Sequence, residues 1–363
     1  MSHHDEISKV LALRPQNAIA RMGADNNICL LNLKDILKVL KDKPVILMAC
    51  NIRIKHVIPG IMRAAEELDA VLGFEAARSE CNLDGGYTGF TPEILFDTVI
   101  EYAKETNFTK PFYIHADHIT IKTTYEEAIV KAQALIAAHL KAGFTSFAID
   151  ASFNQIPDNV KLTTILCQPI IEQGLSLEVE VGEVKSTGTT AELSTVEDAT
   201  SFISGLKANN VHPDLLAINN GSKHGNYLAG EAVSIDLDTT LDIYNAIKGD
   251  GLVIAQHGIT GTPLNVVGKF ADYGIRKGNV GTQWQNIAHE FIPEALMNEM
   301  KAWAKAEDKN IKMATKPFKE KIDNIPEENK KQIADKAYEV AKDFIKAFHA
   351  DGTASDVING LGK

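Results

Sequence analysis

PFYIHADH, residues 111–118, is a short apolar run that ends abruptly in ionisable side chains. The run Pro111 to Ile114 predicts a buried strand, which His115, Asp117 and His118 follow at once. Because side chains two apart on a strand share a face, His115 and Asp117 point the same way, while His118 leaves at the strand's end. A carboxylate beside two imidazoles suits a base next to a metal ligand, since neutral imidazole is the commonest zinc ligand. A polar strand end with a solvated aspartate and a hydrogen-bonded core histidine is the alternative.

The chain around this stretch alternates apolar strands with helical segments. Eight buried strands are expected, each followed by a helical pattern, and they lie at 44–51, 70–77, 111–115, 144–150, 175–182, 214–220, 251–256 and 275–280. Repeated βα units with doubly buried strands predict an α/β fold, a (β/α)8 TIM barrel. A doubly wound open sheet is the alternative, but polar residues recur at the ends of many strands, and no GxGxxG motif follows the first one.

The predicted organisation has three parts. Residues 1–43 form an N-terminal segment that ends in a helix, NLKDILKVLKDK, and leads into the barrel. Residues 44–285 form the catalytic barrel. Residues 286–363 form a charged, helical C-terminal extension whose apolar positions pack on the barrel.

Composition excludes several classes of partner. The 363-residue chain has a net charge of −11, which argues against nucleic acid or an anionic membrane. Its four cysteines are scattered without a CxxC pair, as expected for reduced thiols in a cytoplasmic protein. No apolar segment approaches the length of a membrane span, and the first residues show no signal-peptide pattern.

The fifth strand, LSLEVEVG, alternates polar and apolar residues. If its apolar face meets the helices, Glu178 and Glu180 face the barrel interior. Buried carboxylates need a partner, which is a metal, an arginine or a lysine. An interior salt bridge without a catalytic role is the alternative.

Two further strand ends carry histidines. The sixth ends in INNGSKHGNY and places His224 in a tight turn, and the seventh ends in AQHGITGTP and places His257 before a glycine-rich loop. Together with His118 they lie at the C-terminal ends of three strands, the face that holds the active sites of TIM barrels. Three histidines and an open position are the protein ligands of a catalytic zinc site.

The HGITGTP loop is also suited to an anion. Gly258, Thr260 and Gly261 expose backbone N–H groups and a hydroxyl just before a helix start. The last strand, IRKGNVGT, brings Asn279 and Thr282 to the same face, where such barrels often bind phosphate. A glycine-rich turn with a threonine helix cap is the alternative.

These residues resemble the motifs of the class II (metal-dependent) fructose-bisphosphate aldolases. HADH at 115–118 is similar to the family's HxDH, and EVEVG at 178–182 to its ExELG. KHGNY at 223–227 resembles HGxY, QHGITG at 256–261 resembles HGGSG, and KGNVGT at 277–282 resembles KxNxxT.

The resemblance implies roles for individual residues. His118, His224 and His257 would bind the catalytic Zn2+ or another divalent metal, with Glu180 as an alternative ligand. Asp117 would be the acid/base, and a monovalent cation is a second expected ion. The residues that would bind the sugar phosphate are Asn51, Gly225, Gly258, Thr260, Gly261, Asn279 and Thr282.

The chain departs from the family pattern at three places. The loop after ExELG lacks GGxED, so Glu192 is the candidate proton donor and Glu183 the second. The acidic residue expected after Asn279 is Gly281. No tail motif is visible that would hold a distal phosphate. The basic group that would bind this phosphate is expected to come from Arg53, Lys55, Arg78 or a partner subunit.

The expected function is a glycolytic or gluconeogenic zinc aldolase that cleaves fructose 1,6-bisphosphate to dihydroxyacetone phosphate and glyceraldehyde 3-phosphate. An aldolase for tagatose 1,6-bisphosphate or another phosphorylated ketose, and a non-catalytic subunit of the same family, are the alternatives. A homodimer or higher homo-oligomer is expected.

Overall fold

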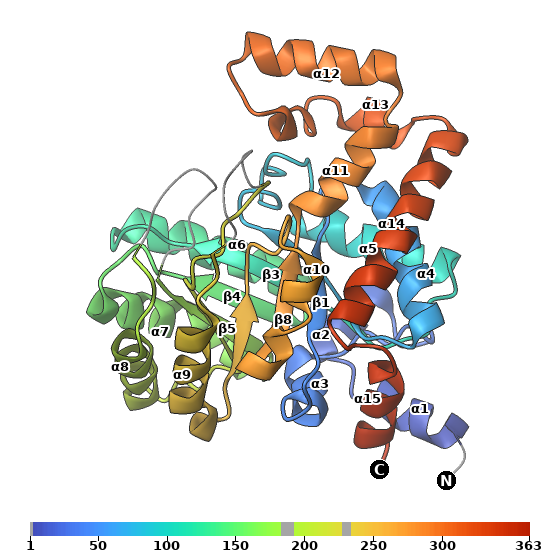
Figure 1. Ribbon diagram of the computed structural model, residues 1–363. Helices are drawn as coiled ribbons and strands as arrows, with labels where there is room; N and C mark the ends of the chain where they lie inside the picture. Colours follow the sequence, from blue (N-terminus) through green and yellow to red (C-terminus); the bar gives the residue numbers. More distant parts are fainter. Residues whose placement is uncertain (1–2, 183–191, 227–233) are drawn as a thin grey trace.

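Eight parallel strands close into a barrel in the computed structural model, which describes residues 3–182, 192–226 and 234–363 (Figure 1). Each strand pairs with the next along the chain, and β1 pairs with β8 to complete the ring. The predicted (β/α)8 barrel is therefore confirmed, and the open sheet is excluded. The strands are β1 (Leu47–Asn51), β2 (Leu72–Ala77), β3 (Phe112–Thr120), β4 (Ser146–Asp150), β5 (Ser176–Val181), β6 (Leu215–Ile218), β7 (Val253–Gln256) and β8 (Ile275–Val280).

Helices surround the barrel between successive strands, as the alternating pattern predicts. They are η1 (Lys55–Val57), α4 (Ile58–Leu68), α5 (Pro92–Glu105), α6 (Glu126–Ala142), α7 (Ile156–Glu172), α8 (Val196–Ala208), α9 (Leu237–Ile247), η2 (Lys248–Asp250), α10 (Leu264–Val267) and η3 (Phe270–Tyr273). Capping side chains determine where some of these helices begin. Thr195 caps α8 in a capping box with Asp198, and Thr91 caps α5. None of the helices described is long and apolar enough to cross a membrane.

The N-terminal segment contains more helix than the sequence pattern indicated. Three helices, α1 (His3–Leu11), α2 (Gln16–Met22) and α3 (Leu33–Leu40), precede β1. Apolar side chains of α1 and α3 join the inward-facing residues Leu47, Ala49 and Tyr113 in one buried cluster. Helix α3 therefore covers the end of the barrel opposite the strands' C-terminal ends, and α1 packs against α15 (Thr353–Leu361).

The chain after β8 is helical, as expected. It comprises α11 (Thr282–Phe291), α12 (Glu294–Ala306), η4 (Ile311–Ala314), α13 (Lys319–Asp323), α14 (Glu327–Ala347) and α15 (Thr353–Leu361). Helix α14 lies along α4, and α15 returns to α3 and α1 (Figure 1). The segment from α12 to α13 lies beyond the C-terminal ends of the strands, at the top of Figure 1.

Every second residue of a barrel strand faces the interior. Along the strands these inward-facing residues become more polar. On β3 the series runs Tyr113, His115, Asp117, and on β8 Lys277 is followed by Asn279. All five side chains are buried. The polar groups thus gather toward the C-terminal ends of the strands.

The end of the third strand differs most from the prediction. The sequence pattern ended the third strand at residue 115, with His118 beyond it, but β3 continues to Thr120. The pairing of β3 with β4 shifts register between Ala116 and Ile119, and His118 has a φ of 40°. A bulge therefore inserts at His118, because Ile119 and Thr120 regain partners on β4. Bulges of this kind redirect side chains near active sites.

Candidate active site

A cavity of about 680 Å³ opens at the C-terminal ends of the strands. Eleven of the thirteen predicted site residues line it: Asn51, Asp117, His118, Glu180, His224, Gly225, His257, Gly258, Thr260, Asn279 and Thr282. Two do not. Gly261 is exposed beside the cavity, and Glu192 is exposed, with its backbone carbonyl accepting a hydrogen bond from Asn219 Nδ2 at 2.8 Å. Glu183, the second candidate proton donor, lies outside the described residues.

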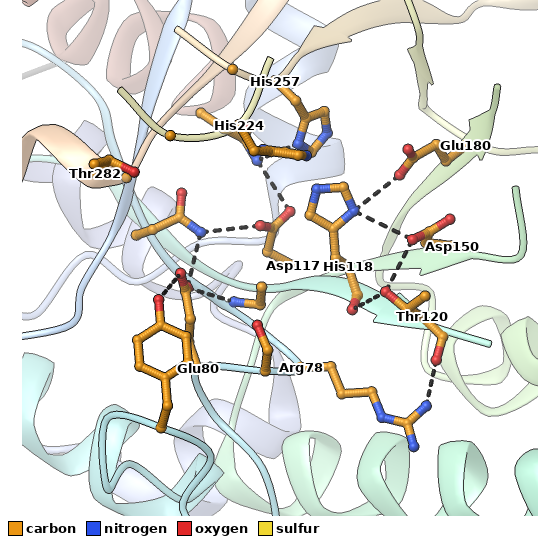
Figure 2. A pocket seen from close by; sticks show the side chains of 18 of the residues that line it. Arg78, Glu80, Asp117, His118, Thr120, Asp150, Glu180, His224, His257 and Thr282 are labelled. Carbon is orange, nitrogen blue, oxygen red and sulfur yellow. Dashed lines mark hydrogen bonds and ion pairs between the residues drawn. The ribbon is translucent and has the colours of Figure 1, made fainter. Parts of the chain in front are cut away.

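Three histidines meet at the centre of the cavity (Figure 2). The ring centroid of His118 lies 4.3 Å from that of His257 and 5.3 Å from that of His224. One nitrogen of each can be chosen so that all three lie within 4.8 Å of one another. The loops that carry His224 and His257 touch at Gly258, where an added Cβ would lie 2.6 Å from the backbone oxygen of Lys223. Gly258 also has a φ of 67°, so a glycine is required for this approach.

The chemistry of these histidines fits a metal ion. Nδ1 of His118 lies 3.0 Å from Glu180 Oε2, whereas its buried Nε2 has no hydrogen-bond partner among the described residues. Burial opposes a charge on His118, but the neighbouring Asp117 and Glu180 outweigh it and raise the pKa of the imidazole. Burial, with the charges of His118 and His257, lowers the pKa of His224 to about 3, so this ring is neutral. The carboxylates around His118 thus favour positive charge at this place, and its Nε2 is unpartnered, as a metal-binding site requires.

A second group of possible ligands adjoins the first. His118, Asp150 and Glu180 also offer atoms within 4.8 Å of one another. Asp150 Oδ2 lies 3.6 Å from His118 Nδ1 and accepts a hydrogen bond from Thr120 Oγ1 at 3.0 Å. Sequence reasoning missed Asp150, although a carboxylate at the end of the fourth strand was a usable signal. This arrangement fits the alternative-ligand role expected for Glu180.

His257 is oriented by a buried carboxylate below the cavity. Its Nε2 lies 3.0 Å from Glu178 Oε1, and its Nδ1 lies 3.2 Å from Asn279 Nδ2. Because the carboxylate accepts the Nε2 proton, Nδ1 keeps the lone pair on the cavity side. Glu178 Oε2 in turn lies 3.0 Å from Nζ of Lys277.

Lys277 is the buried partner of Glu178 and of a second interior glutamate, Glu75. Its Nζ lies 3.1 Å from Glu75 Oε2 and donates to Asn279 Oδ1 at 2.7 Å. Burial opposes its charge, but Glu178 and Glu75 outweigh that effect and raise the pKa of the lysine. Lys277 does not line the cavity, so it holds Asn279 and Glu178 in place and does not meet a ligand.

Asp117 is fixed by two amides at the cavity floor. Asn51 Nδ2 donates to Oδ2 at 3.0 Å, and Asn279 Nδ2 donates to Oδ1 at 3.1 Å. Burial would raise the pKa of Asp117, but His118, His257 and Lys277 outweigh it and lower the pKa. The carboxylate is therefore ionised and able to accept a proton.

The loops after β7 and β8 meet at the start of α11. Thr260 Oγ1 accepts a hydrogen bond from the backbone N–H of Gln283 at 3.2 Å. Thr282 Oγ1 accepts one from Arg53 Nη1 at the same distance. Hydroxyls and backbone N–H groups thus come together here, as a phosphate site requires.

Comparisons with known proteins agree with this geometry. A family model described as fructose-bisphosphate aldolase class-II matches residues 31–353. A fructose-bisphosphate aldolase of Streptococcus pneumoniae is 27% identical over 248 residues, which span 66% of this chain and 75% of the relative.

Two solved structures are also similar. The YdjI aldolase of Escherichia coli K12 has a TM-score of 0.62 at 18% identity, with 88% of this chain and 97% of that chain covered. A probable tagatose 6 phosphate kinase of Sinorhizobium meliloti has a TM-score of 0.59 at 18% identity, with 87% and 86% covered. At such identities the two structures support the barrel fold alone.

Proposed function

The chain belongs to the class II fructose-bisphosphate aldolases, a family of metal-dependent carbon–carbon lyases, and on that premise we propose that it cleaves fructose 1,6-bisphosphate reversibly. The products are dihydroxyacetone phosphate and glyceraldehyde 3-phosphate. One observation carries the proposal: the ionised Asp117 lies beside the three histidines, with Asn51 and Asn279 holding its carboxylate.

The proposed metal is zinc, held by His118, His224 and His257, with Glu180 as the ligand for a shifted ion. When bound, the ion supplies Lewis-acid chemistry toward the negative charge that develops on the three-carbon fragment. Asp117 takes the proton of the C4 hydroxyl in cleavage and returns it in condensation. Asn279 is poised between Asp117 and His257, so it can orient the oxygens of the fragment.

The phosphate of dihydroxyacetone phosphate is proposed to bind Gly258, Thr260 and Thr282 beside the first turn of α11, with Gly225 and Gly261 flanking it. Glu192 remains the proposed proton donor to the carbanion. It lies next to residues 183–191, which are outside the described part of the chain. The proposal also includes a monovalent cation as a second ion, a homo-oligomeric assembly and a glycolytic role in the cytoplasm. The proposed domain boundaries are 1–43, 44–285 and 286–363.

A different ketose phosphate is the second candidate, favoured by one observation at the sugar end of the cavity. An added Cβ at Gly281, where the family pattern has an acidic residue, would lie 3.2 Å from Arg53 Nη2. The guanidinium of Arg53 thus lies beside the position where the family pattern has an acidic side chain. A bound sugar would therefore meet a cation there instead of a carboxylate. Tagatose 1,6-bisphosphate, which differs from fructose 1,6-bisphosphate at C4, is the natural comparison.

The test is release of dihydroxyacetone phosphate from purified, zinc-loaded protein supplied with each ketose bisphosphate in turn. A coupled glycerol 3-phosphate dehydrogenase reports the product. We expect the highest kcat/KM with fructose 1,6-bisphosphate, and no activity in His224→Ala, whose metal content is measured in parallel. Faster cleavage of the tagatose compound would support the second candidate. No product from any ketose phosphate would contradict both and favour a non-catalytic subunit.

A further inference from the structure

Among the residues that the structure describes, four arginine and lysine side chains line the cavity: Arg53, Arg78, Lys122 and Lys312. Two of them are engaged on the β3 side. Arg78 donates to the backbone oxygen of Thr120, and Lys122 Nζ lies 4.2 Å from the ring centroid of Phe153. The other two, Arg53 and Lys312, both lie against the ring of Tyr87, at 5.9 Å and 5.5 Å from its centroid. Lys55, which the sequence suggested as a third source of positive charge, instead lies 3.5 Å from Asp323.

The charges around Tyr87 do not balance. Glu80 is the carboxylate at this place, and its Oε1 accepts from Arg53 Nε at 2.7 Å and from the Tyr87 hydroxyl at 3.0 Å. No ion pair of Lys312 occurs within the described ranges. Burial lowers the pKa of Lys312, and the positive charge of Arg53 lowers it further, while Glu80 opposes them. Two cations therefore share one carboxylate inside a protein whose net charge is −11.

The Arg53 side chain and the backbone segment that carries Lys312 are both held in place before any ligand arrives. Arg53 donates from Nη1 to Thr282 Oγ1 at 3.2 Å and to Gln285 Oε1 at 2.9 Å. Lys312 belongs to η4, and the chain just after it is anchored to the β2–α5 loop, where the backbone N–H of Lys316 donates to Tyr87 O at 2.9 Å. Thr315 Oγ1 also accepts from Gln285 Nε2 at 3.3 Å.

The cations are linked to the acid/base by a short chain of hydrogen bonds. Asn51 Nδ2 donates to Asp117 at 3.0 Å and to Glu80 at 3.3 Å, and Glu80 binds Arg53. The three histidines come from β3 and the loops after β6 and β7, whereas Arg53 follows β1 and Lys312 lies over the loop after β2. A ketose whose C4 hydroxyl meets Asp117 can therefore extend its far end toward this pair.

We propose that Arg53 and Lys312 form an anion subsite that binds the phosphate of the aldehyde half of the substrate. The inference rests on the proposed aldolase function and adds the groups that select a phosphorylated aldehyde. The C-terminal extension thus supplies part of the active site from the same chain, in place of the tail motif that the sequence lacks. Arg53 provides a fixed guanidinium. Lys312 provides a positive charge that forms no ion pair with a carboxylate of the described residues.

The experiment measures substrate binding without turnover. Fructose 1,6-bisphosphate and fructose 1-phosphate are titrated by calorimetry into zinc-loaded Asp117→Asn protein, and again into the same protein with Lys312→Met. We expect the bisphosphate to bind more tightly than the monophosphate, and Lys312→Met to weaken bisphosphate binding about 10- to 100-fold with little change for fructose 1-phosphate. Lys312→Arg should restore most of the difference.

Lys309→Met is the matched control, because Lys309 lies in the same segment but lines the neighbouring groove, 3.5 Å from Glu307. It should leave both affinities unchanged. Equal weakening of both sugars by Lys312→Met, or no weakening of either, overturns the subsite. Binding of both sugars with equal affinity by Asp117→Asn protein that keeps Lys312 also overturns it, whereas binding of neither sugar contradicts the aldolase proposal itself.

Discussion

Nε2 of His257 lies 3.0 Å from Oε1 of Glu178, and both side chains are 1% exposed. The carboxylate therefore fixes the ring's proton on Nε2 and turns Nδ1 toward the cavity. Glu178 stays ionised because Lys277 and His257 outweigh the cost of burial and lower the pKa of its carboxyl. An interior glutamate that does not line the cavity thus orients a proposed metal ligand.

Replacing Glu178 with glutamine should weaken zinc binding about 10- to 100-fold, the usual effect of losing a carboxylate behind a histidine ligand. Glutamine keeps the shape but removes the charge that holds the Nε2 proton. Lys277 keeps a partner in Glu75, so the barrel should remain folded. Zinc affinity is measured by competition with a chelator, and circular dichroism checks the fold. Ser176→Ala, on the same face of β5, should leave the affinity unchanged; an unaltered affinity in Glu178→Gln would contradict the orienting role.

Asp117→Asn should keep the metal and the fold but lower kcat by about 10²–10⁴, the typical contribution of a positioned acid/base. Asparagine can still accept one of the two hydrogen bonds that Asn51 and Asn279 donate, but it cannot accept the C4 hydroxyl proton. Single-turnover cleavage of the bisphosphate measures the loss, and metal analysis serves as the control. Wild-type rates in this variant would remove Asp117 from the mechanism.

The fold was predictable because parallel strands buried on both faces are continuous apolar runs in the sequence. The run PVILMACN at 44–51, for example, contains β1. The end of β3 was not predictable, since the bulge at His118 depends on where Ile119 and Thr120 pair with β4. Such pairing is a tertiary feature that local sequence does not encode.

The candidate site was predictable where its residues follow strands, since strand ends of a barrel meet at one face. His224, His257 and Asn279 were found in this way, whereas Asn51 was indicated by the family resemblance. Lys312 was not, because η4 belongs to a charged helical segment whose pattern resembles a solvated surface. Only the packing of that segment on the loop of Tyr87 brings it to the cavity.

Acid should destabilise the protein partly through His139. Burial lowers the pKa of His139 to about 4, well below the usual 6.5. The folded state therefore stays neutral at this ring while the unfolded state takes up a proton as the pH falls from 6.5 to 4. The stabilisation is complete above pH 6.5 and is lost progressively below it, by up to about 3 kcal/mol.

Urea unfolding of His139→Leu between pH 7.5 and 4 tests this titration, since this range covers both pKa values of the ring. We expect a shallower decline in unfolding free energy than in the wild type. His212→Gln, at an exposed position, should keep the wild-type slope. An equally steep decline in His139→Leu would show that other groups account for the acid sensitivity.

Gly60 on α4 allows α14, the longest helix of the C-terminal extension, to pack directly against the barrel's first helix. An added Cβ at this position would lie 1.9 Å from the backbone oxygen of Ala334 and 2.8 Å from the backbone nitrogen of Tyr338. Backbone atoms cannot turn aside as a flexible side chain can, so α14 would have to move away.

Gly60→Ala should therefore lower the unfolding free energy by about 1–3 kcal/mol, the range for an overpacked interior. The loss should appear even though alanine favours the helical conformation by up to about 1 kcal/mol over glycine. Gly249→Ala is the matched control, because a Cβ there meets no atom within 4 Å, and it should be neutral or slightly stabilising. Chemical denaturation of both variants gives the comparison. Equal stabilities would mean that α14 shifts without cost and that its contact with α4 is not tightly packed.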